Sequence, residues 1–270
     1  MTVTRRQAQE LLDRHGVRPS RALGQNFVVD PNTVRRVVRL AGVQAGDQVV
    51  EVGAGMGALT LALAESGAQV TAVERDRHLL PVLEEVLEHA DPRPTIVAAD
   101  ALHLDWAAVL DGADRWHLVA NLPYNVATPL VLDLLDHVPA IDRMLVMVQR
   151  EVGERLSAAP GTKAYGIPSV KVAYWAEAAL VGRVPANVFW PRPKVESVLV
   201  RIERRPEPAT SADPDALFAL VRAGFGHRRK MLRGALAGLV DATGFERSGI
   251  SPEARAEELS VEEWGRLVDA

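Results

Sequence analysis

The sequence predicts an α/β fold, in which a doubly wound, mostly parallel sheet is followed by a small C-terminal helical domain. Three patterns indicate this fold. Short apolar runs alternate with segments of helical periodicity from residue 49 to residue 158. A turn with three glycines follows the first apolar run. After a polar linker at 204–214, the periodicity is helical to the end of the chain. Alternating strands and helices favour parallel strands joined by right-handed crossovers.

Two helices are predicted before the first sheet strand. The first covers residues 5–15, where apolar residues recur at helical spacing. The second begins at Pro31, with Asp30 as its N-cap, and ends at Gly42. The segment between them is loop-like and contains the unusual cluster Gly-Gln-Asn-Phe at 24–27.

The glycine turn is the feature around which the rest of the chain is organised. Residues 49–52 predict a buried strand, and residues 59–64 predict a helix. Gly53, Gly55 and Gly57 lie between them, and the absence of a Cβ lets a ligand approach the main chain. A ligand here would lie at the carboxyl end of a strand and the positive end of a helix.

Three interpretations of this turn remain open: a nicotinamide or flavin site, an S-adenosylmethionine site, or a plain tight turn. The Gly-x-Gly-x-Gly spacing differs from the Gly-x-Gly-x-x-Gly of the dinucleotide fingerprint. Glu51 precedes the first glycine, where a carboxylate would repel a pyrophosphate but favour the amine and sulfonium of S-adenosylmethionine. Both details favour S-adenosylmethionine.

The remaining elements extend the alternation. No helix is predicted between the last two strands, so we expect them to form an antiparallel pair at the sheet edge. The linker divides the chain into predicted domains at 1–205 and 206–270. Further strands are predicted over 69–74, 95–99, 116–120, 143–149, 176–183 and 197–203, and further helices over 79–87, 128–135 and 150–158.

Composition excludes several classes of protein. The chain has 270 residues, 48% of them hydrophobic, which is enough for one large domain and one small one. No apolar run is long enough to span a membrane, and residues 1–14 contain no apolar signal core, so we expect a cytoplasmic protein. The absence of cysteine excludes disulfides and thiolate metal sites, and the histidines show no ligand spacing, so no metal is expected. With a net charge of −4, any nucleic-acid binding must come from local patches.

Polar residues recur at successive strand ends, which line one crevice in an open α/β sheet. Each has a role if the ligand is S-adenosylmethionine, although a carboxylate at a strand end can also be only a helix cap. Gly53 brings main-chain groups close to the amino-acid end, Glu74 accepts from the ribose hydroxyls, and Asp100 accepts from the adenine amine. Asn121 ends the fourth strand.

The Asn121-Leu122-Pro123-Tyr124 turn is the most specific motif. An adenine amine is a poor nucleophile because its lone pair is delocalised into the ring. The Asn121 side-chain oxygen and the Leu122 carbonyl could both accept from this amine and favour its tetrahedral form. Tyr124 could stack on a base taken out of its helix. The alternative is a proline turn with a core tyrosine.

Two basic segments could hold an RNA backbone, although each could also be an ordinary solvated surface. Phe27 and Phe189 are either further stacking platforms or core residues. The basic candidates are Arg192 and Lys194 in the first segment, and Arg228, Arg229, Lys230 and Arg233 in the second.

With these motifs in place, the sequence resembles the rRNA adenine N6,N6-dimethyltransferases that modify small-subunit ribosomal RNA. The resemblance covers nearly the whole chain, and the Gly-Gln-Asn-Phe and Asn-Leu-Pro-Tyr motifs are the most specific to adenine-N6 methylation. The stretches at 189–197 and 225–233 point to the small-subunit branch. The matching stretches are 23–27, 51–60, 73–76, 99–101, 121–125, 189–197 and 225–233.

The resemblance implies a Rossmann-like class I S-adenosylmethionine-dependent methyltransferase domain followed by a helical RNA-binding domain. It implies dimethylation of two adjacent adenosines in the 3′-terminal hairpin loop of 16S rRNA, within a partly assembled 30S subunit. Family members often have Leu where Val28 stands, and a main-chain contact there tolerates the change. The implied cofactor contacts are Asn26, Val28, Gly53, Glu74, Asp100 and Asn121.

Two alternatives share these features. A 23S rRNA adenine-N6 methyltransferase of the macrolide-resistance type has the same catalytic motifs, but the chain length and the basic segment at 228–233 argue against it. A non-catalytic ribosome-assembly factor would keep the fold for binding alone, and the intact Asn121 and Tyr124 argue against that. We expect a monomer.

Overall fold

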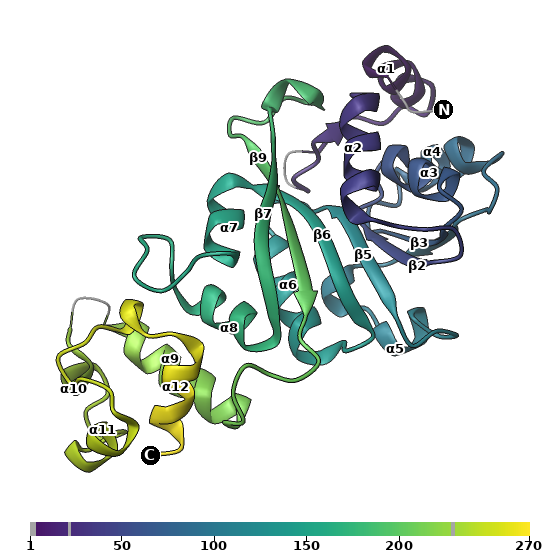
Figure 1. Ribbon diagram of the computed structural model, residues 1–270. Coiled ribbons are helices and arrows are strands. Elements are labelled where there is room, and N and C mark those ends of the chain that lie inside the picture. Colours follow the sequence, from purple (N-terminus) through teal and green to yellow (C-terminus); the bar gives the residue numbers. More distant parts are fainter. Residues whose placement is uncertain (1–3, 21–22, 228–229) are drawn as a thin grey trace. The chain divides into compact units, whose positions relative to one another are not determined.

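The computed structural model describes residues 4–20, 23–227 and 230–270, which belong to two compact units (Figure 1). Unit 1 comprises Met1–Gly153 and Ala179–Glu203, and unit 2 comprises Glu154–Ala178 and Arg204–Ala270. The boundary between Glu203 and Arg204 lies close to the one expected from the sequence, which was between residues 205 and 206. The sequence placed residues 154–178 with the sheet, however, whereas the structure assigns them to the helical unit.

Among the described residues, seven strands form the main sheet in the order β4-β3-β2-β5-β6-β9-β7. The pairs β2–β3, β2–β5, β3–β4 and β5–β6 are parallel, and β9 runs antiparallel to β6. The α/β fold class is therefore confirmed, and β7 and β9 lie side by side at the edge. The bounds are β2 Gln48–Val52, β3 Gln69–Glu74, β4 Thr95–Ala98, β5 Trp116–Asn121, β6 Ile141–Gln149, β7 Ala176–Val184 and β9 Ser197–Arg204.

Helices cover both faces of this sheet, which is why apolar residues of its central strands are buried on both faces. Val49 and Val50, consecutive residues of β2, are both fully buried although their side chains point to opposite faces. Figure 1 shows α2 and α3 in front of the sheet and α6 behind it. The helices are α1 Arg5–Arg14, α2 Pro31–Ala41, α3 Ala58–Glu65, α4 Leu80–Leu87, α5 Trp106–Val109, α6 Ala127–His137 and α7 Arg150–Leu156, with short 3₁₀ turns at Ala101–His103 and Ala186–Val188.

The predicted start and end of α2 are confirmed. The Asp30 side chain accepts a hydrogen bond from the Thr33 amide at 2.8 Å, and Pro31 occupies the first turn. Gly42 ends the helix in the left-handed conformation, with a φ of 67°.

A short antiparallel ladder was not expected from the sequence. Strand β1, Phe27–Val28, pairs with β8, Phe189–Trp190. Phe189 is 1% exposed and belongs to the core, so it is not a stacking platform. The ladder joins the Gly-Gln-Asn-Phe segment to the segment that carries Arg192 and Lys194.

Unit 2 is helical and has a core of its own, centred on the fully buried Trp264. Residues of the 154–178 segment contribute to this core: the Tyr165 hydroxyl donates to the Leu259 carbonyl at 2.8 Å, and the Tyr174 hydroxyl donates to the Ala212 carbonyl at 2.9 Å. These contacts explain why the segment belongs here. The helices are α8 Ile167–Trp175, α9 Pro214–Gly226, α10 Leu232–Ala235, α11 Ala242–Ser248 and α12 Val261–Val268, with a 3₁₀ turn at Ala256–Glu258. Across the described ranges, no helix is both long and apolar enough to cross a membrane.

Candidate active site

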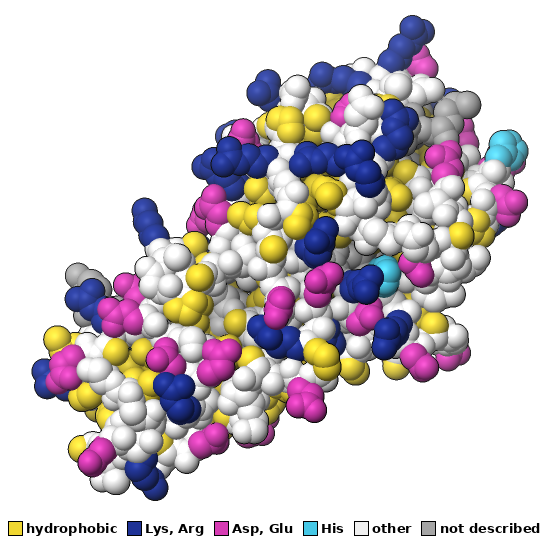
Figure 2. All heavy atoms as spheres, in the orientation of Figure 1, with side chains coloured by type: hydrophobic (Ala, Val, Ile, Leu, Met, Phe, Trp, Pro, Cys, Tyr) yellow, Lys and Arg dark blue, Asp and Glu magenta, His cyan; other side chains and the backbone are white. Residues whose placement is uncertain are grey.

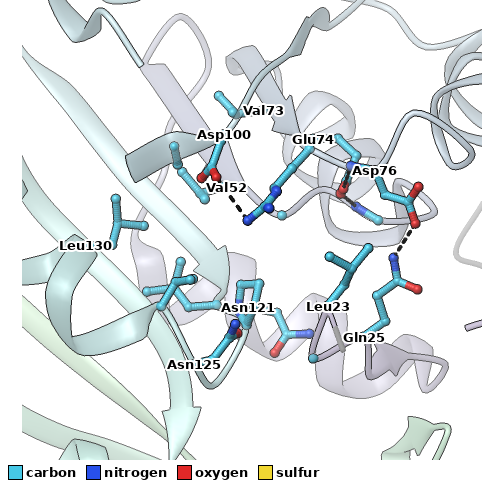
Figure 3. A pocket seen from close by; sticks show the side chains of 18 of the residues that line it. Leu23, Gln25, Val52, Val73, Glu74, Asp76, Asp100, Asn121, Asn125 and Leu130 are labelled. Atoms are coloured by element: carbon cyan, nitrogen blue, oxygen red, sulfur yellow. Dashed lines mark hydrogen bonds and ion pairs between the residues drawn. The ribbon is translucent and has the colours of Figure 1, made fainter. Parts of the chain in front are cut away.

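A pocket in unit 1 lies at the carboxyl ends of β2, β3, β4 and β5 (Figure 3). In Figure 3, Glu74, Asp76 and Asp100 lie on one side of it, and Leu23, Gln25 and Asn121 lie on the other. The glycine loop and the Asn-Leu-Pro-Tyr turn therefore face the same cavity. Its lining comes from residues 23–27, 73–76, 99–102 and 121–126, together with Val52, Gly53, Gly55, Leu79 and Leu130.

The glycine loop packs directly against the other motifs, and this contact requires glycine. Gly53 and Gly55 have φ values of 75° and 60°, which L-residues rarely adopt. A Cβ on Gly53 would lie 3.3 Å from Pro123 Cδ, and a Cβ on Gly55 would lie 3.1 Å from the Phe27 ring. The close approach that the sequence predicted for a ligand is therefore also an approach between segments of the protein.

Glu74 ends β3 and connects it to the glycine loop. Its two carboxylate oxygens accept hydrogen bonds from the Gly55 amide at 2.7 Å and from the Asp76 amide at 2.8 Å. The side chain is 7% exposed, and this burial raises its pKa, against the opposing effect of the backbone donors. A carboxylate has about four acceptor sites, so further sites remain for a ligand hydroxyl.

Asp100 lies two residues after the end of β4, where it caps the 3₁₀ turn Ala101–His103, and it has a partner of opposite charge. It pairs with the Arg75 guanidinium at 3.0 Å and accepts from the Leu102 amide at 3.2 Å. Among the described lining residues, three carboxylates (Glu74, Asp76 and Asp100) therefore face one guanidinium. This excess of negative charge suits a ligand with an amine or a sulfonium and disfavours a pyrophosphate.

Glu51 was expected to supply part of this negative charge, and that expectation is wrong. Its side chain is not among the described lining residues of the pocket and is only 2% exposed. The Thr60 hydroxyl donates to it at 2.5 Å, and burial raises its pKa to about 8. Glu51 is therefore an internal group between β2 and α3.

Asn121 is held by the opposite wall of the pocket. Its Nδ2 donates to the Asn26 carbonyl at 3.0 Å, and the Asn26 side chain in turn donates to the Gly24 carbonyl. Because the nitrogen is used by the protein, the orientation of the amide is fixed and Oδ1 remains available as an acceptor. The sequence predicted roles for Asn26 and Asn121 separately but gave no sign that they are bonded.

Tyr124 is oriented by a residue that the sequence analysis did not single out. Its hydroxyl shares a hydrogen bond of 2.8 Å with the hydroxyl of Ser197, which is fully buried at the start of β9. Burial raises the pKa of Tyr124, so its phenol stays protonated near neutral pH. The Gln25 amide was also missed: it donates to Asp76 at 2.7 Å, across the pocket.

Of the predicted catalytic and cofactor-binding residues, the structure brings all but Val28 together around the pocket. Val28 does not line the pocket, because it lies in β1 opposite Phe189. Arg192 and Lys194 line an adjoining groove of unit 1. Lys230 and Arg233 belong to unit 2, where Arg233 pairs with Glu253 at 3.4 Å. Arg228 and Arg229 lie outside the described residues. The residues that do line the pocket are Asn26, Gly53, Glu74, Asp100, Asn121, Leu122 and Tyr124.

Solved structures with this fold include methyltransferases. A dimethyladenosine transferase from Plasmodium falciparum superposes with a TM-score of 0.75, at 22% identity, over 88% of this chain and 94% of that one. The 23S rRNA methyltransferase ErmE superposes with a TM-score of 0.70, at 24% identity, over 90% of this chain and 98% of that one. The chain therefore has the Rossmann-like class I methyltransferase fold.

The sequence comparisons are more specific. The chain belongs to the ribosomal RNA adenine dimethylase family, whose model matches residues 17–270. It is 48% identical to the ribosomal RNA small subunit methyltransferase A of Streptomyces coelicolor, over 97% of this chain and 94% of the relative. The protein of the same name from Thermobifida fusca is 46% identical, over 94% of this chain and 91% of the relative. The family predicted from the motifs is confirmed.

Proposed function

We propose that this enzyme transfers methyl groups from S-adenosylmethionine to the N6 amines of two adjacent adenosines in the 3′-terminal hairpin loop of 16S rRNA. The observation that carries the proposal is the position of Asn121, whose fixed side-chain amide faces the same pocket as the glycine loop. The full-length relatives named for the small subunit favour 16S rRNA over the 23S alternative. The likeness to ErmE concerns the fold alone.

The residues of the pocket fit S-adenosylmethionine as the methyl donor. Glu74 would accept from its ribose hydroxyls, Asp100 from its adenine amine, and the main chain at Gly53 would lie beside its amino-acid end. Val28 is not needed for this arrangement. When bound, the cofactor supplies a methyl group on a positively charged sulfur, and the surplus of carboxylates around the pocket favours that charge.

The chain's own contribution to the reaction is positioning. Asn121 Oδ1 and the Leu122 carbonyl would accept from the target amine and favour its tetrahedral form, in which the lone pair is free to attack. Tyr124, oriented by Ser197, would stack on the flipped base. The amine becomes strongly acidic once it carries the methyl group, so water can take its proton and no strong general base is needed.

We further propose that the helical unit and the Arg192-Lys194 segment bind the RNA backbone. Figure 2 shows Lys and Arg interspersed with Asp and Glu over the visible face, so the attraction is local. The enzyme would act as a monomer on the 30S subunit or its precursor, and hence in the cytoplasm. Removing the charge at Lys230 should flatten the salt dependence of particle binding, and light scattering of the purified protein tests the monomer.

A labelling experiment tests the proposed activity. The protein is incubated with radiolabelled S-adenosylmethionine and undermodified 30S or 50S particles, and the label is mapped. Label at two adjacent adenosines in 30S particles supports the proposal, whereas label in 50S particles favours the 23S alternative. No label, with binding to 30S particles retained, favours a non-catalytic assembly factor. Asn121→Ala provides the matched inactive control.

A further inference from the structure

A second groove of unit 1, which we call the flanking groove, is continuous with the candidate active site. The two cavities share residues 24–26, Tyr124 and Asn125. The rest of the flanking groove comes from Pro19, Gln149 and residues 191–195. An RNA strand that places one base in the active site must continue over an adjacent surface of the protein. The flanking groove is such a surface, and it shares Tyr124 with the pocket.

The charge of the flanking groove differs from that of the pocket beside it. Among its described lining residues none is acidic, whereas the pocket presents three carboxylates. Arg192 and Lys194 are exposed, and within the described chain neither has a recorded ion-pair partner. The neighbouring Glu196 lies 3.5 Å from Arg150 instead. The groove therefore presents two available cations, which suit a phosphate.

Gln149 gives the groove a group that can recognise a base. It is the last residue of β6, and its main chain is fixed opposite Ser197 in the antiparallel ladder with β9. Its half-buried side chain lines the groove, and no hydrogen bond to another described residue is recorded for its amide. An amide offers one acceptor and two donors, which matches the edge of a nucleobase.

We propose that the flanking groove binds the nucleotide next to the target adenosine, with its phosphate on Arg192 and Lys194 and its base edge on Gln149. This inference rests on the proposed function. Two adjacent adenosines must enter the active site in turn, so one of them lies outside while the other reacts. Tyr124 lines both cavities, and its bond to Ser197 fixes the ring between the two bases.

The test is a cycle that combines a protein variant with an RNA variant. Undermodified 30S particles carry either the native pair of adenosines or an abasic nucleotide in place of one of them. Wild type, Gln149→Ala and the control Gln69→Ala are compared by kcat/KM for methylation of the remaining adenosine. Gln69 is an exposed residue at the start of β3, whose other end carries Glu74 of the pocket. It lies outside both cavities.

We expect the abasic neighbour to lower kcat/KM about tenfold for wild type and for Gln69→Ala. Gln149→Ala should show a similar loss on the native pair and little further loss with the abasic neighbour, because both changes remove one contact. The assignment would be overturned if the loss in kcat/KM from Gln149→Ala and the loss from the abasic neighbour multiply when the two changes are combined. It would also be overturned if Gln149→Ala is as active as wild type on the native pair. If wild type labels no 30S particle at all, the proposed function fails, and the groove assignment fails with it.

The cations give an independent readout. Replacing both Arg192 and Lys194 with Ala should lower the slope of log affinity against log salt by about 0.7, the value for one phosphate of a single strand. Affinity for S-adenosylmethionine should not change, since neither residue lines the pocket. An unchanged salt slope, or an equal loss of cofactor affinity, would contradict a phosphate site here.

Discussion

Removal of the hydrogen bond between Tyr124 and Ser197 should lower both stability and methyl transfer, and the two single substitutions should not add. The two hydroxyl oxygens are 2.8 Å apart, and Ser197 is fully buried. Tyr124→Phe keeps the ring but leaves the buried Ser197 hydroxyl without its partner, which costs about 1–3 kcal/mol. Ser197→Ala leaves the phenol hydroxyl, which is partly exposed and can bind water, so its cost is about 0.5–1.5 kcal/mol.

The double variant removes both hydroxyls and leaves no buried group unsatisfied. It should therefore be no less stable than Tyr124→Phe alone, and the coupling energy between the two sites should be about 1 kcal/mol or more. Urea unfolding of the four proteins measures this energy. Methyl transfer to 30S particles should show the same pattern in kcat. Ser197→Ala should keep its affinity for S-adenosylmethionine, because Ser197 does not line the pocket.

Two results would refute this reasoning. If the stability losses simply add, the two hydroxyls do not interact in solution. If Ser197→Ala methylates at the wild-type rate, packing alone orients the Tyr124 ring, and the hydrogen bond has no part in catalysis. A parallel loss of cofactor affinity in Ser197→Ala would show instead that the substitution disturbs the whole pocket.

Three further predictions concern the same region. Asn121→Ala should abolish methylation but keep cofactor affinity within about tenfold, roughly 1.4 kcal/mol; a larger loss by calorimetry would show that Asn121 is mainly a cofactor ligand. Gly53→Ala should cost about 1–2 kcal/mol in urea unfolding because of its positive φ, and should lower kcat because the new Cβ presses on Pro123; unchanged values would contradict the close packing. Burial raises the pKa of Glu51 from 4.5 to about 8, so the folded state holds a proton that the unfolded state has lost, and stability should fall as pH rises between these values. Glu51→Gln should flatten this dependence between pH 5 and pH 8, and equal slopes for both proteins would contradict it.

The centre of the main sheet could be predicted because its strands are covered on both faces. Strand β3 was predicted over residues 69–74 and is observed over Gln69–Glu74. Five of its six residues are buried, so the apolar run and the strand coincide. The start of α2 was equally clear, because Asp30 and Pro31 are both strong local signals. In each case, the residues that determine the element lie within it or directly before it.

Most elements and bonds that depend on contacts between residues far apart in the sequence were not predicted. Strands β1 and β8 have two residues each, and their pairing joins residue 27 to residue 190. Helix α8 was missed because Ile167–Trp175 is apolar, contains three valine or isoleucine residues, and shows no amphipathic pattern. The bonds of Asn121 to Asn26 and of Tyr124 to Ser197 are likewise long-range. Only the presence of Ser197 in the family motif at 189–197 could have drawn attention to it.

The error at Glu51 has a simpler origin. Successive side chains of a strand point to opposite faces, so the residue two positions before Gly53 does not share the surroundings of the residue just before it. Val52 lines the pocket, whereas Glu51 points to Thr60 on α3. The sequence position next to the glycine loop suggested a role in ligand binding that the alternation of the strand excludes.

Residues 23–27 connect the two ends of the active site. A nucleotide cleft at the strand ends of an open sheet lacks a wall on its outer side, and this segment supplies it. Gln25 is bonded to Asp76 at the cofactor end, and the Asn26 carbonyl is bonded to Asn121 at the end where the target base would lie. Phe27 then pairs with Trp190, just before Arg192. Because one short segment makes all these contacts, a displacement at the cofactor end would reach the Asn121 amide and the flanking groove together.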